Sequence, residues 1–388
     1  MSEPRRKRIA VNTRLLLKDK LEGIGIYTHE IVRRIVKEHP EVDFYFLFDR
    51  SFSSDFIYGE NVIPLIVHPP TRHPFLWWIW LKFSVPLMLR KIKPDLFISL
   101  DGFALLSGKI SQLIAIHDIN FIHRPQDLSF IVRKFYAHYF PIFAMKGNTI
   151  ITVSEFSKRE LIDKYCTTNE KIVVAGNALP TEQFELWERP NVVNRASEWT
   201  TNKIYFSFVG AIHPRKNVKG MLKAFELFKK ESSNEHVKLI IAGVPIRSYR
   251  SEWSQLLKSN KYSDSILAVG RVTELEKRTI LEKSIALLYP SFYEGFGIPM
   301  LEAWKAKTAV LASNSSAFPE IAGNAALLIN PHSTRDWAKK MQEIQSNSAL
   351  RKVLIENGTK RLHIFSWEKS SFLIWKEIQT LLKVNSAK

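Results

Sequence analysis

One plan recurs in both halves of the chain and constrains its fold more than any other feature. A short apolar run is followed by a turn, often with glycine, and then by a segment whose apolar residues have helical spacing. Such regular alternation of strands and helices is typical of a parallel, doubly wound sheet. The sequence therefore predicts an α/β fold with a parallel, doubly wound sheet in each half. The predicted strands are residues 7–11, 42–48, 62–67, 95–100, 113–116, 149–153, 172–174, 204–209, 238–242, 266–269, 284–289 and 309–312.

The length of the chain supports two domains. A single hydrophobic core rarely serves 388 residues, so two domains of about 150–200 residues are expected. We predict an N-terminal domain at residues 1–185 and a C-terminal domain at 186–365. The polar residues 181–202 are predicted to form the linker. A last helix, within residues 366–388, is expected to cross back to the first domain.

Composition is that of an ordinary globular protein, with 45% hydrophobic and 24% charged residues. The one cysteine, Cys166, excludes an internal disulfide framework and favours a reducing compartment. We expect Cys166 to be a small core residue. No secretory signal is recognisable. The longest apolar stretch, residues 75–89, is interrupted by Lys82 and Pro86 and is too short to span a membrane. A cytoplasmic protein is expected.

The formal net charge of +18 favours anionic partners. Residues 1–185 contribute 25 Lys and Arg against 20 Asp and Glu, or +5, and residues 186–388 contribute 31 against 18, or +13. A nucleotide diphosphate, an acidic membrane surface and nucleic acid are all candidates, and so is a merely solvated basic surface.

Residues 73–90 contain three tryptophans and two flanking cations. Tryptophan with Lys or Arg suits the headgroup region of a membrane, so one interpretation is a membrane-interface element. The other, which we favour, is a helix packed on the sheet with one aromatic edge exposed, because aromatic residues most often serve cores.

The stretch from Ser284 to Trp304 carries the most informative chemistry. It predicts a buried strand, a turn with two glycines, and a helix with Pro299 in its first turn. Glu294 is then in the loop and Glu302 in the first helical turn. A helix N-terminus suits phosphate, and ionised carboxylates accept hydrogen bonds from hydroxyl groups. Phosphate with a polyhydroxyl group describes a nucleotide sugar, although an ordinary turn with solvated glutamates would give the same pattern.

Three other sites follow predicted strands. Gly23 and Gly25 form a predicted glycine loop before a helix, a weak sign of phosphate binding. His117 follows the strand 113–116, at the edge of an open sheet where ligands bind. Arg215 and Lys216 precede a helix at 218–229, where charge and helix dipole both attract phosphate. Ser154 is the predicted N-cap of the helix that follows it.

These motifs resemble, in order, those of the retaining glycosyltransferases of family four, which have two Rossmann-like domains in the GT-B arrangement. Glu294 and Glu302 match the E-x7-E motif, with Gly-Phe-Gly and a proline between them. The resemblance is greatest to the mannosyltransferase-like branch that builds bacterial surface polysaccharides. Further agreeing segments are residues 23–28, 117–118, 153–157, 214–217, 270–272 and 365–367.

The resemblance implies a role for each matching position. Arg215 and Lys216 would hold the donor diphosphate, Glu302 the ribose and Glu294 the donor sugar, while His117 would face the reacting sugar. No metal or other cofactor is implied. The catalytic positions are then His117 and Glu294, and the donor-binding positions are Gly23, Gly25, Arg215, Lys216, Gly270, Arg271, Glu294, Gly295, Phe296, Gly297 and Glu302.

Two departures qualify the match. Many members have an arginine directly after the glycine that ends the first strand of the second domain, where this chain has Ala211. Arg215 must then supply that charge. Many members also read Asn-Gly after the last strand of the first domain, where this chain has Gly176-Asn177.

The resemblance implies transfer of a hexose, mannose first among the candidates, from a GDP- or UDP-sugar to a hydroxyl of a glycan acceptor in polysaccharide or lipopolysaccharide synthesis. A lipid-linked acceptor and a peripheral contact with the anionic inner face of the cell membrane are compatible with it. The alternatives are a GT-B nucleotide-sugar epimerase and a basic nucleic-acid-binding protein. Nucleic acid is disfavoured as a partner, because most aromatic residues fall in predicted strands and helices rather than among exposed cations.

Overall fold

The computed structural model describes residues 5–18, 20–190, 194–232 and 235–386. The chain divides into two compact units, residues 1–177 with 366–388 and residues 178–365. The division therefore falls at 177/178, earlier than the 185/186 expected from the sequence. The difference arises because residues 181–188 form a helix of the second unit instead of a linker.

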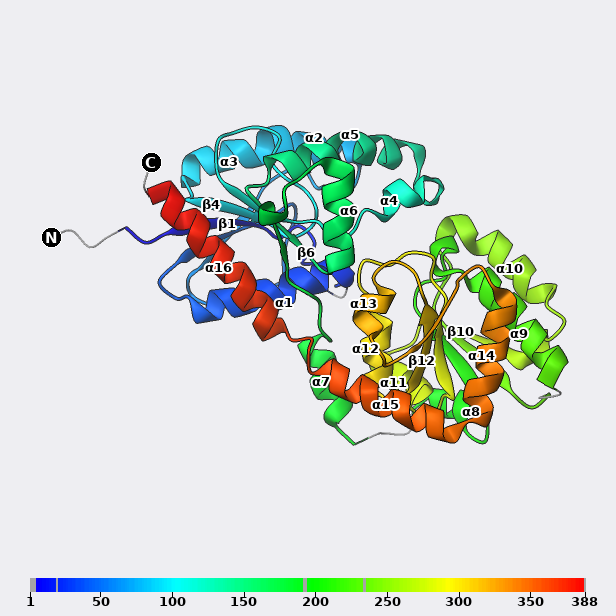
Figure 1. Cartoon of the computed structure of the whole chain (residues 1–388). Helices are drawn as coiled ribbons and strands as arrows, with labels where there is room; N and C mark the ends of the chain where they lie inside the picture. Colours follow the sequence, from blue (N-terminus) through cyan, green and yellow to red (C-terminus); the bar gives the residue numbers. More distant parts are fainter. Residues whose placement is uncertain (1–4, 19, 191–193, 233–234, 387–388) are drawn as a thin grey trace. The chain divides into compact units, whose positions relative to one another are not determined.

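The first unit contains a seven-stranded sheet of order β3-β2-β1-β4-β5-β6-β7 (Figure 1). Every neighbouring pair is parallel, which confirms the predicted doubly wound α/β fold. The order changes direction between β1 and β4, so a topological switch point lies at their carboxyl ends. The strands are β1 (Arg8–Asn12), β2 (Asp43–Phe48), β3 (Val62–Ile66), β4 (Leu96–Ser99), β5 (Gln112–Ala115), β6 (Thr149–Thr152) and β7 (Ile172–Val174).

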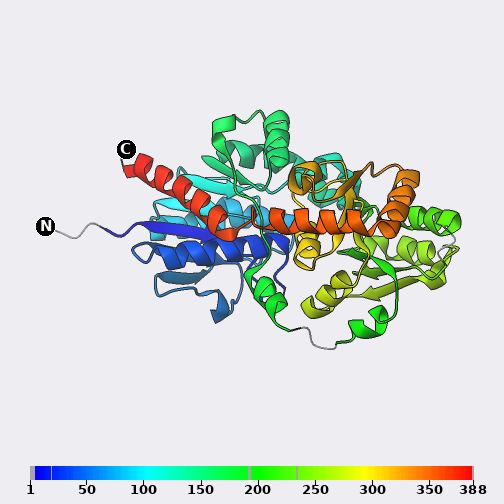
Figure 2. The ribbon, with the colours of Figure 1, turned by 60° about the horizontal axis from the view of Figure 1, so that its bottom comes forward.

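Helices cover both faces of this sheet. Figure 1 shows α2, α3 and α5 on one face and α1 with the C-terminal helix α16 on the other, and Figure 2 shows α16 beside α1 again. Buried aromatic residues such as Trp80, Phe97 and Phe143 fill the core. The helices are α1 (Gly23–Glu38), α2 (Pro74–Ile79), the π-helical turn η2 (Trp80–Ser84), α3 (Val85–Ile92), α4 (Asn120–His123), α5 (Phe130–Lys146), α6 (Glu155–Tyr165) and α16 (Trp367–Ser386), with short 3₁₀ turns at η1 (Ser54–Phe56), η3 (Pro125–Asp127) and η4 (Asn169–Lys171).

The second unit contains a six-stranded parallel sheet of order β10-β9-β8-β11-β12-β13. Helices α9, α10 and α14 pack on one face, and α11, α12 and α15 on the other (Figure 1). The strands are β8 (Tyr205–Val209), β9 (Lys238–Ala242), β10 (Ile266–Gly270), β11 (Ala286–Tyr289), β12 (Ala309–Ser313) and β13 (Leu327–Ile329). The helices are α7 (Thr181–Glu188), α8 (Ala196–Thr200), α9 (Val218–Ser232), α10 (Arg250–Lys258), α11 (Glu274–Glu282), α12 (Ile298–Lys305), α13 (Phe318–Ala322), α14 (Thr334–Ser346) and α15 (Ser348–Leu362), with 3₁₀ turns at η5 (Pro214–Lys216), η6 (Arg247–Tyr249) and η7 (Ser263–Ser265).

Two expectations for this part of the sequence need correction. Residues 181–202 are not an extended linker, because α7 and α8 lie within them; residues 191–193 lie outside the described residues. Cys166 is exposed, not in the core: with φ +52° it ends α6 in a left-handed conformation. The N-cap prediction for Ser154 is confirmed, since its hydroxyl accepts a hydrogen bond from the backbone N–H of Ser157 at 3.1 Å.

The tryptophan-rich segment forms α2, η2 and α3. Trp80 is fully buried, and its ring N–H donates to the carbonyl oxygen of Val67 at 2.7 Å. Phe75, Phe83 and Leu87 are 61%, 47% and 56% exposed. The segment is therefore a packed helix with an exposed apolar edge, as the favoured interpretation had it. Across the described ranges, no helix is both long and apolar enough to cross a membrane.

Candidate functional site

Three charged side chains meet at the carboxyl edge of the second sheet. Arg215 and Lys216 lie in the 3₁₀ turn η5 after β8, and Glu294 lies in the loop after β11. Because β8 and β11 are neighbouring parallel strands, the loops that follow them lie side by side. A backbone hydrogen bond of 2.9 Å, from the N–H of Phe292 to the carbonyl of Arg215, joins the two loops.

Glu294 uses both carboxylate oxygens to bind the two cations. Its Oε1 is 2.6 Å from Nζ of Lys216, and its Oε2 is 2.7 Å from Nη1 of Arg215. Arg215 Nη1 also donates to the carbonyl of Tyr293 at 2.6 Å, and Lys216 Nζ lies 3.3 Å from the hydroxyl of Tyr289. Since the Lys216 and Glu294 side chains are only 12% and 10% exposed, the cluster is a preorganised and largely dry arrangement of charge.

The cluster keeps its charges. Burial pushes the pKa of Glu294 upward, but the charges of Arg215 and Lys216 outweigh it and hold that pKa at about 2. Glu294 is therefore ionised near neutral pH and acts only as a hydrogen-bond acceptor. Burial lowers the pKa of Lys216, with Arg215 adding to the effect and Glu294 opposing it. A partly desolvated ammonium of this kind interacts strongly with an incoming anion.

The turn between Glu294 and α12 presents backbone donors. Gly297 has φ +123°, a conformation that side chains rarely adopt, and an added Cβ would come within 2.8 Å of Met300 Cε. Glycine is therefore required there. In the described part of the chain, the N–H groups of Phe296 and Gly297 have no hydrogen-bond acceptor. They precede the N-terminus of α12, which suits them to an anionic or oxygen-rich ligand. The neighbouring Gly295 lies in the same turn.

Glu302 belongs to a second cluster. It is the fifth residue of α12, beyond the first turn where the sequence placed it, and is 5% exposed. Its Oε1 accepts from Nζ of Lys277 at 2.8 Å and from Nε2 of Gln183 at 3.0 Å. Lys277 also pairs with Glu274 at 2.9 Å. Burial lowers the pKa of Lys277, but the charges of Glu302 and Glu274 raise it by more. The net shift of the pKa is upward, so the lysine stays charged.

Sequence reasoning missed Lys277, which lies on α11, 25 positions before Glu302. Its signal was weak: a lysine in the first turn of a helix is usually a solvated residue. Gly270 and Arg271 do follow β10 at the same sheet edge. The Arg271 guanidinium is exposed, and with the described residues it makes no hydrogen bond or ion pair, so the structure does not bring it into either cluster.

The first unit holds the remaining predicted residues. His117 follows β5, at the carboxyl edge of its sheet, and its Nε2 lies 2.9 Å from the carbonyl oxygen of Leu100. This contact makes Nε2 the protonated nitrogen of the neutral ring. Burial lowers the pKa of His117, which favours that neutral form. The ring also stands edge-on to Tyr27 at 4.7 Å.

The predicted glycine loop at Gly23 and Gly25 is wrong. Both residues lie in the first turn of α1, which begins at Gly23. Gly25 is nevertheless needed for a close approach, because an added Cβ would lie 2.8 Å from the carbonyl oxygen of Leu15. Glycine's poor helix propensity favoured a loop in the sequence, and packing of α1 against the preceding loop overrides that preference.

Two family models match almost the whole length of the chain. Residues 21–183 match the model described as Glycosyltransferase Family 4, and residues 193–361 match Glycosyl transferases group 1. The chain belongs to glycosyltransferase family 4. Its two parallel α/β sheets are those of the GT-B fold.

Named relatives are distant. O-antigen chain mannosyltransferase B of Escherichia coli is 28% identical over 56% of this chain and 57% of the relative. O-antigen chain mannosyltransferase RfbU of Salmonella typhimurium is 28% identical over 61% of each. The chain therefore aligns with less than two thirds of either relative. Among solved structures, HepE of Anabaena in complex with UDP-glucose has a TM-score of 0.70 at 14% identity, covering 96% of this chain and 99% of that one, which shows a shared fold.

Proposed function

We propose that this glycosyltransferase moves a hexose from a nucleoside diphosphate sugar to a hydroxyl of a glycan acceptor, with retention of anomeric configuration. The observation that carries the proposal is the cluster of Arg215, Lys216 and Glu294 beside the N-terminus of α12. Two cations and unpaired backbone donors suit a diphosphate, and the carboxylates of Glu294 and Glu302 suit sugar and ribose hydroxyls.

The departing diphosphate develops negative charge as the glycosidic bond breaks. Arg215, Lys216 and the N–H groups of Phe296 and Gly297 would stabilise that charge, and such preorganised donors act strongly in a site that excludes water. Glu294 would accept from hydroxyls of the donor sugar and Glu302 from the ribose. This division of roles needs no metal ion. His117 is the second proposed catalytic residue: its ring is neutral, its Nε2 is held by the carbonyl of Leu100, and its Nδ1 can accept a hydrogen bond.

The finer assignments rest on the relatives. Both named relatives are O-antigen mannosyltransferases, so mannose is the proposed sugar and surface polysaccharide or lipopolysaccharide synthesis the proposed role. Because HepE was solved with UDP-glucose, the proposed donors include a UDP-sugar as well as a GDP-sugar. The assignment extends to Gly23, Gly25, Gly270 and Arg271 as donor-binding residues, with Arg271 reorienting on binding.

A thermal-shift panel tests the donor assignment. At about 100 times its dissociation constant a ligand stabilises the folded protein by roughly 2.7 kcal/mol. We expect at least one GDP- or UDP-sugar to raise Tm by several degrees. The matching nucleoside monophosphate should raise it less, because it lacks the β-phosphate that the two cations would bind. If no nucleoside diphosphate sugar shifts Tm, the proposed donor class is wrong.

An epimerase is the second candidate, and product analysis separates the two. An epimerase would convert its nucleotide sugar without an acceptor, whereas a transferase releases free nucleoside diphosphate only slowly in that condition. The relatives named as transferases favour the first outcome.

We also propose that the enzyme docks on an anionic membrane, where a lipid-linked acceptor is presented. The docking face consists of α2, η2, α3 and α5, which lie together on the first unit (Figure 1). Residues 74–92 and 130–146 hold six Lys and Arg and no Asp or Glu. Phe130 and Ile131 are 63% and 53% exposed, and Ile131 lines a surface pocket together with the exposed Phe75. The ammonium of Lys134 lies 5.7 Å from the centroid of the Phe130 ring.

This composition fits an anionic bilayer in particular. Exposed apolar side chains insert at the level of the headgroups, and nearby cations gain about 1 kcal/mol each from anionic lipid. The two units carry equal net charge, but on the docking face every charged residue is positive, which makes the first unit the proposed contact.

Vesicle flotation tests the docking face. The wild-type protein should float with vesicles containing about 30% anionic lipid and be released by high salt, which screens surface charge beyond a few ångströms. The double variant Phe75→Ser, Phe130→Ser should lose most of this binding. Phe372→Ser is the matched control, because Phe372 is 65% exposed but lies on α16. Flotation that is unchanged in the double variant, or that is absent in the wild type, would contradict the proposal.

A further inference from the structure

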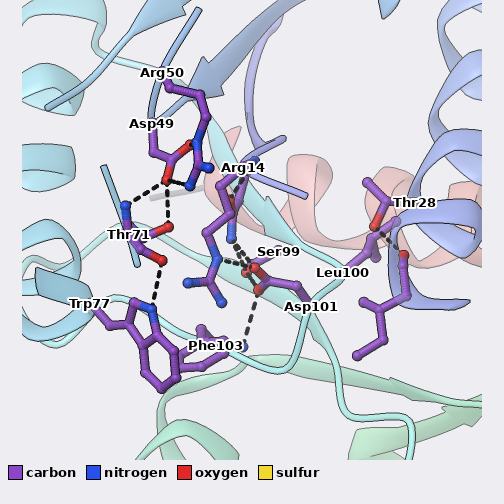
Figure 3. A network of polar contacts seen from close by, with 12 residues as sticks. Arg14, Thr28, Asp49, Arg50, Thr71, Trp77, Ser99, Leu100, Asp101 and Phe103 are labelled. Carbon is purple, nitrogen blue, oxygen red and sulfur yellow. Dashed lines mark hydrogen bonds and ion pairs between the residues drawn. The ribbon is translucent and has the colours of Figure 1, made fainter. Parts of the chain in front are cut away.

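A second polar site lies at the topological switch point of the first sheet. Arg14 follows β1 and Asp101 follows β4, and these two strands are parallel neighbours (Figure 3). In open α/β sheets, ligands bind outside the carboxyl ends of the strands at this position. Neither residue belongs to the donor cluster, which lies in the second unit.

Asp101 is fully occupied within the protein. Its Oδ2 accepts from Arg14 Nε at 2.5 Å and from Asn12 Nδ2 at 2.9 Å. Its Oδ1 accepts from the Ser99 hydroxyl at 2.9 Å and from the N–H of Phe103 at 3.3 Å. The side chain is 3% exposed. Asp101 therefore orients Arg14 and has no capacity left for a ligand.

Arg14 has donors to spare. Its side chain is 6% exposed, and only its Nε is used in the pair with Asp101. Its two terminal amino groups make no hydrogen bond to the residues that the structure describes, and in Figure 3 they point away from Asp101. They are not among the fully buried unpaired polar atoms of the described residues, so they lie at a small open surface beside an otherwise buried side chain. Donors held there without a protein acceptor are available to a ligand. These amino groups therefore indicate a ligand that offers oxygen acceptors.

Aromatic rings surround the guanidinium. Its central carbon lies 4.2 Å from the Phe103 ring centroid and 5.8 Å from that of Trp77. The Tyr136 ring is 6.2 Å from each of these two rings. The Tyr136 hydroxyl also makes no hydrogen bond to the residues that the structure describes, and the residue is half-buried. Donors framed by aromatic faces suit a ligand with hydroxyl oxygens and apolar C–H faces.

The net charge around Arg14 distinguishes an anionic ligand from a neutral one. An anion needs net positive charge, but the charged groups here sum to −1. His117, neutral in the adjoining loop, adds no charge and can accept a hydrogen bond at Nδ1. In the described part of the chain, the charged groups that act on Tyr136 at this site are Arg14, Asp101 and Asp118.

We propose that Arg14, Tyr136 and the rings of Trp77 and Phe103 form a subsite for a neutral hexopyranose of the acceptor glycan. Hydroxyl oxygens of the sugar accept from the Arg14 amino groups and from the Tyr136 hydroxyl. This inference rests on the proposed function, since it names the substrate class that the first unit receives.

Saturation-transfer NMR on the full chain tests the subsite, with methyl α-D-mannopyranoside as the probe and UDP and GDP titrated on the same samples. Tyr136→Phe removes one hydroxyl that has no protein partner, so it should fold normally. We expect it to weaken mannoside binding by about tenfold or more, as expected for the loss of a hydrogen bond to a ligand. Arg14→Met should weaken it further, and neither variant should change nucleotide affinity by more than about twofold.

Arg50→Met is the matched control, because Arg50 lies at the same end of the sheet but already pairs with Asp49 at 2.7 Å through two nitrogens. It should bind the mannoside as the wild type does. Mannoside binding that is unchanged in Tyr136→Phe and Arg14→Met, or nucleotide binding without any mannoside contact in the wild type, would overturn the subsite. Failure of both UDP and GDP to bind would instead count against the proposed function.

Discussion

Replacement of Lys216 by alanine should lower the transfer rate by about 10²- to 10³-fold, which is typical of losing one preorganised group that stabilises developing negative charge. Lys216 Nζ lies in a largely buried cluster, where its interaction with the departing diphosphate is weakly screened. The loss should appear in kcat more than in donor affinity, because the charge on the leaving group grows only as the bond breaks.

The variant should still fold. Glu294 keeps its 2.7 Å ion pair with Arg215 after Lys216 is removed, so no buried carboxylate is left alone. Lys219→Ala is the matched control: Lys219 lies three residues further on and is 53% exposed, in a pair with Glu252 that solvent screens. Single-turnover rates and circular dichroism of the three proteins would decide the matter. Wild-type transfer by a folded Lys216→Ala protein would remove Lys216 from the mechanism.

The sequence predicted most of the fold because parallel strands buried on both faces have a distinct pattern. Short apolar runs such as Leu113–Ile116 are unmistakable when both faces of the sheet are covered. The sequence missed the strand Leu327–Ile329, which has three residues and pairs only with β12 at the sheet edge. Helix α5 was missed because it is apolar on most sides and contains Pro141, so it lacks the amphipathic period that marks a surface helix.

Some residues of the candidate site could likewise be predicted from the sequence, and others could not. Glu294 and Glu302 are linked by local spacing, so a single strand–turn–helix segment reveals both. Lys277, Arg14 and Tyr136 come from separate elements, and only the folded sheet brings each to its partner. The glycine pair at 23–25 shows the opposite error, because local propensity suggested a loop where tertiary packing imposes a helix. Sequence reasoning therefore finds residues that share a motif and misses those that share only a location.

The other large effect is expected at Glu302. Glu302→Gln should weaken binding of the nucleoside diphosphate by about tenfold to a hundredfold, because a carboxylate binds the ribose hydroxyls more strongly than an amide does. Lys277 keeps Glu274 as a partner at 2.9 Å, so the substitution does not leave a lone buried ammonium. Calorimetric titration gives the affinity. Glu252→Gln, on an exposed glutamate of the same unit, should bind as the wild type does.

A ligand without ribose hydroxyls makes this test specific. The 2′,3′-dideoxy form of the nucleotide cannot donate to Glu302, so the wild type should bind it about as weakly as Glu302→Gln binds the normal nucleotide. The variant should hardly distinguish the two ligands. If Glu302 acted only by holding Lys277 in place, the substitution would instead weaken both ligands by the same factor, since the two effects would then be independent. The difference between these two patterns separates contact with the ribose from a purely structural role.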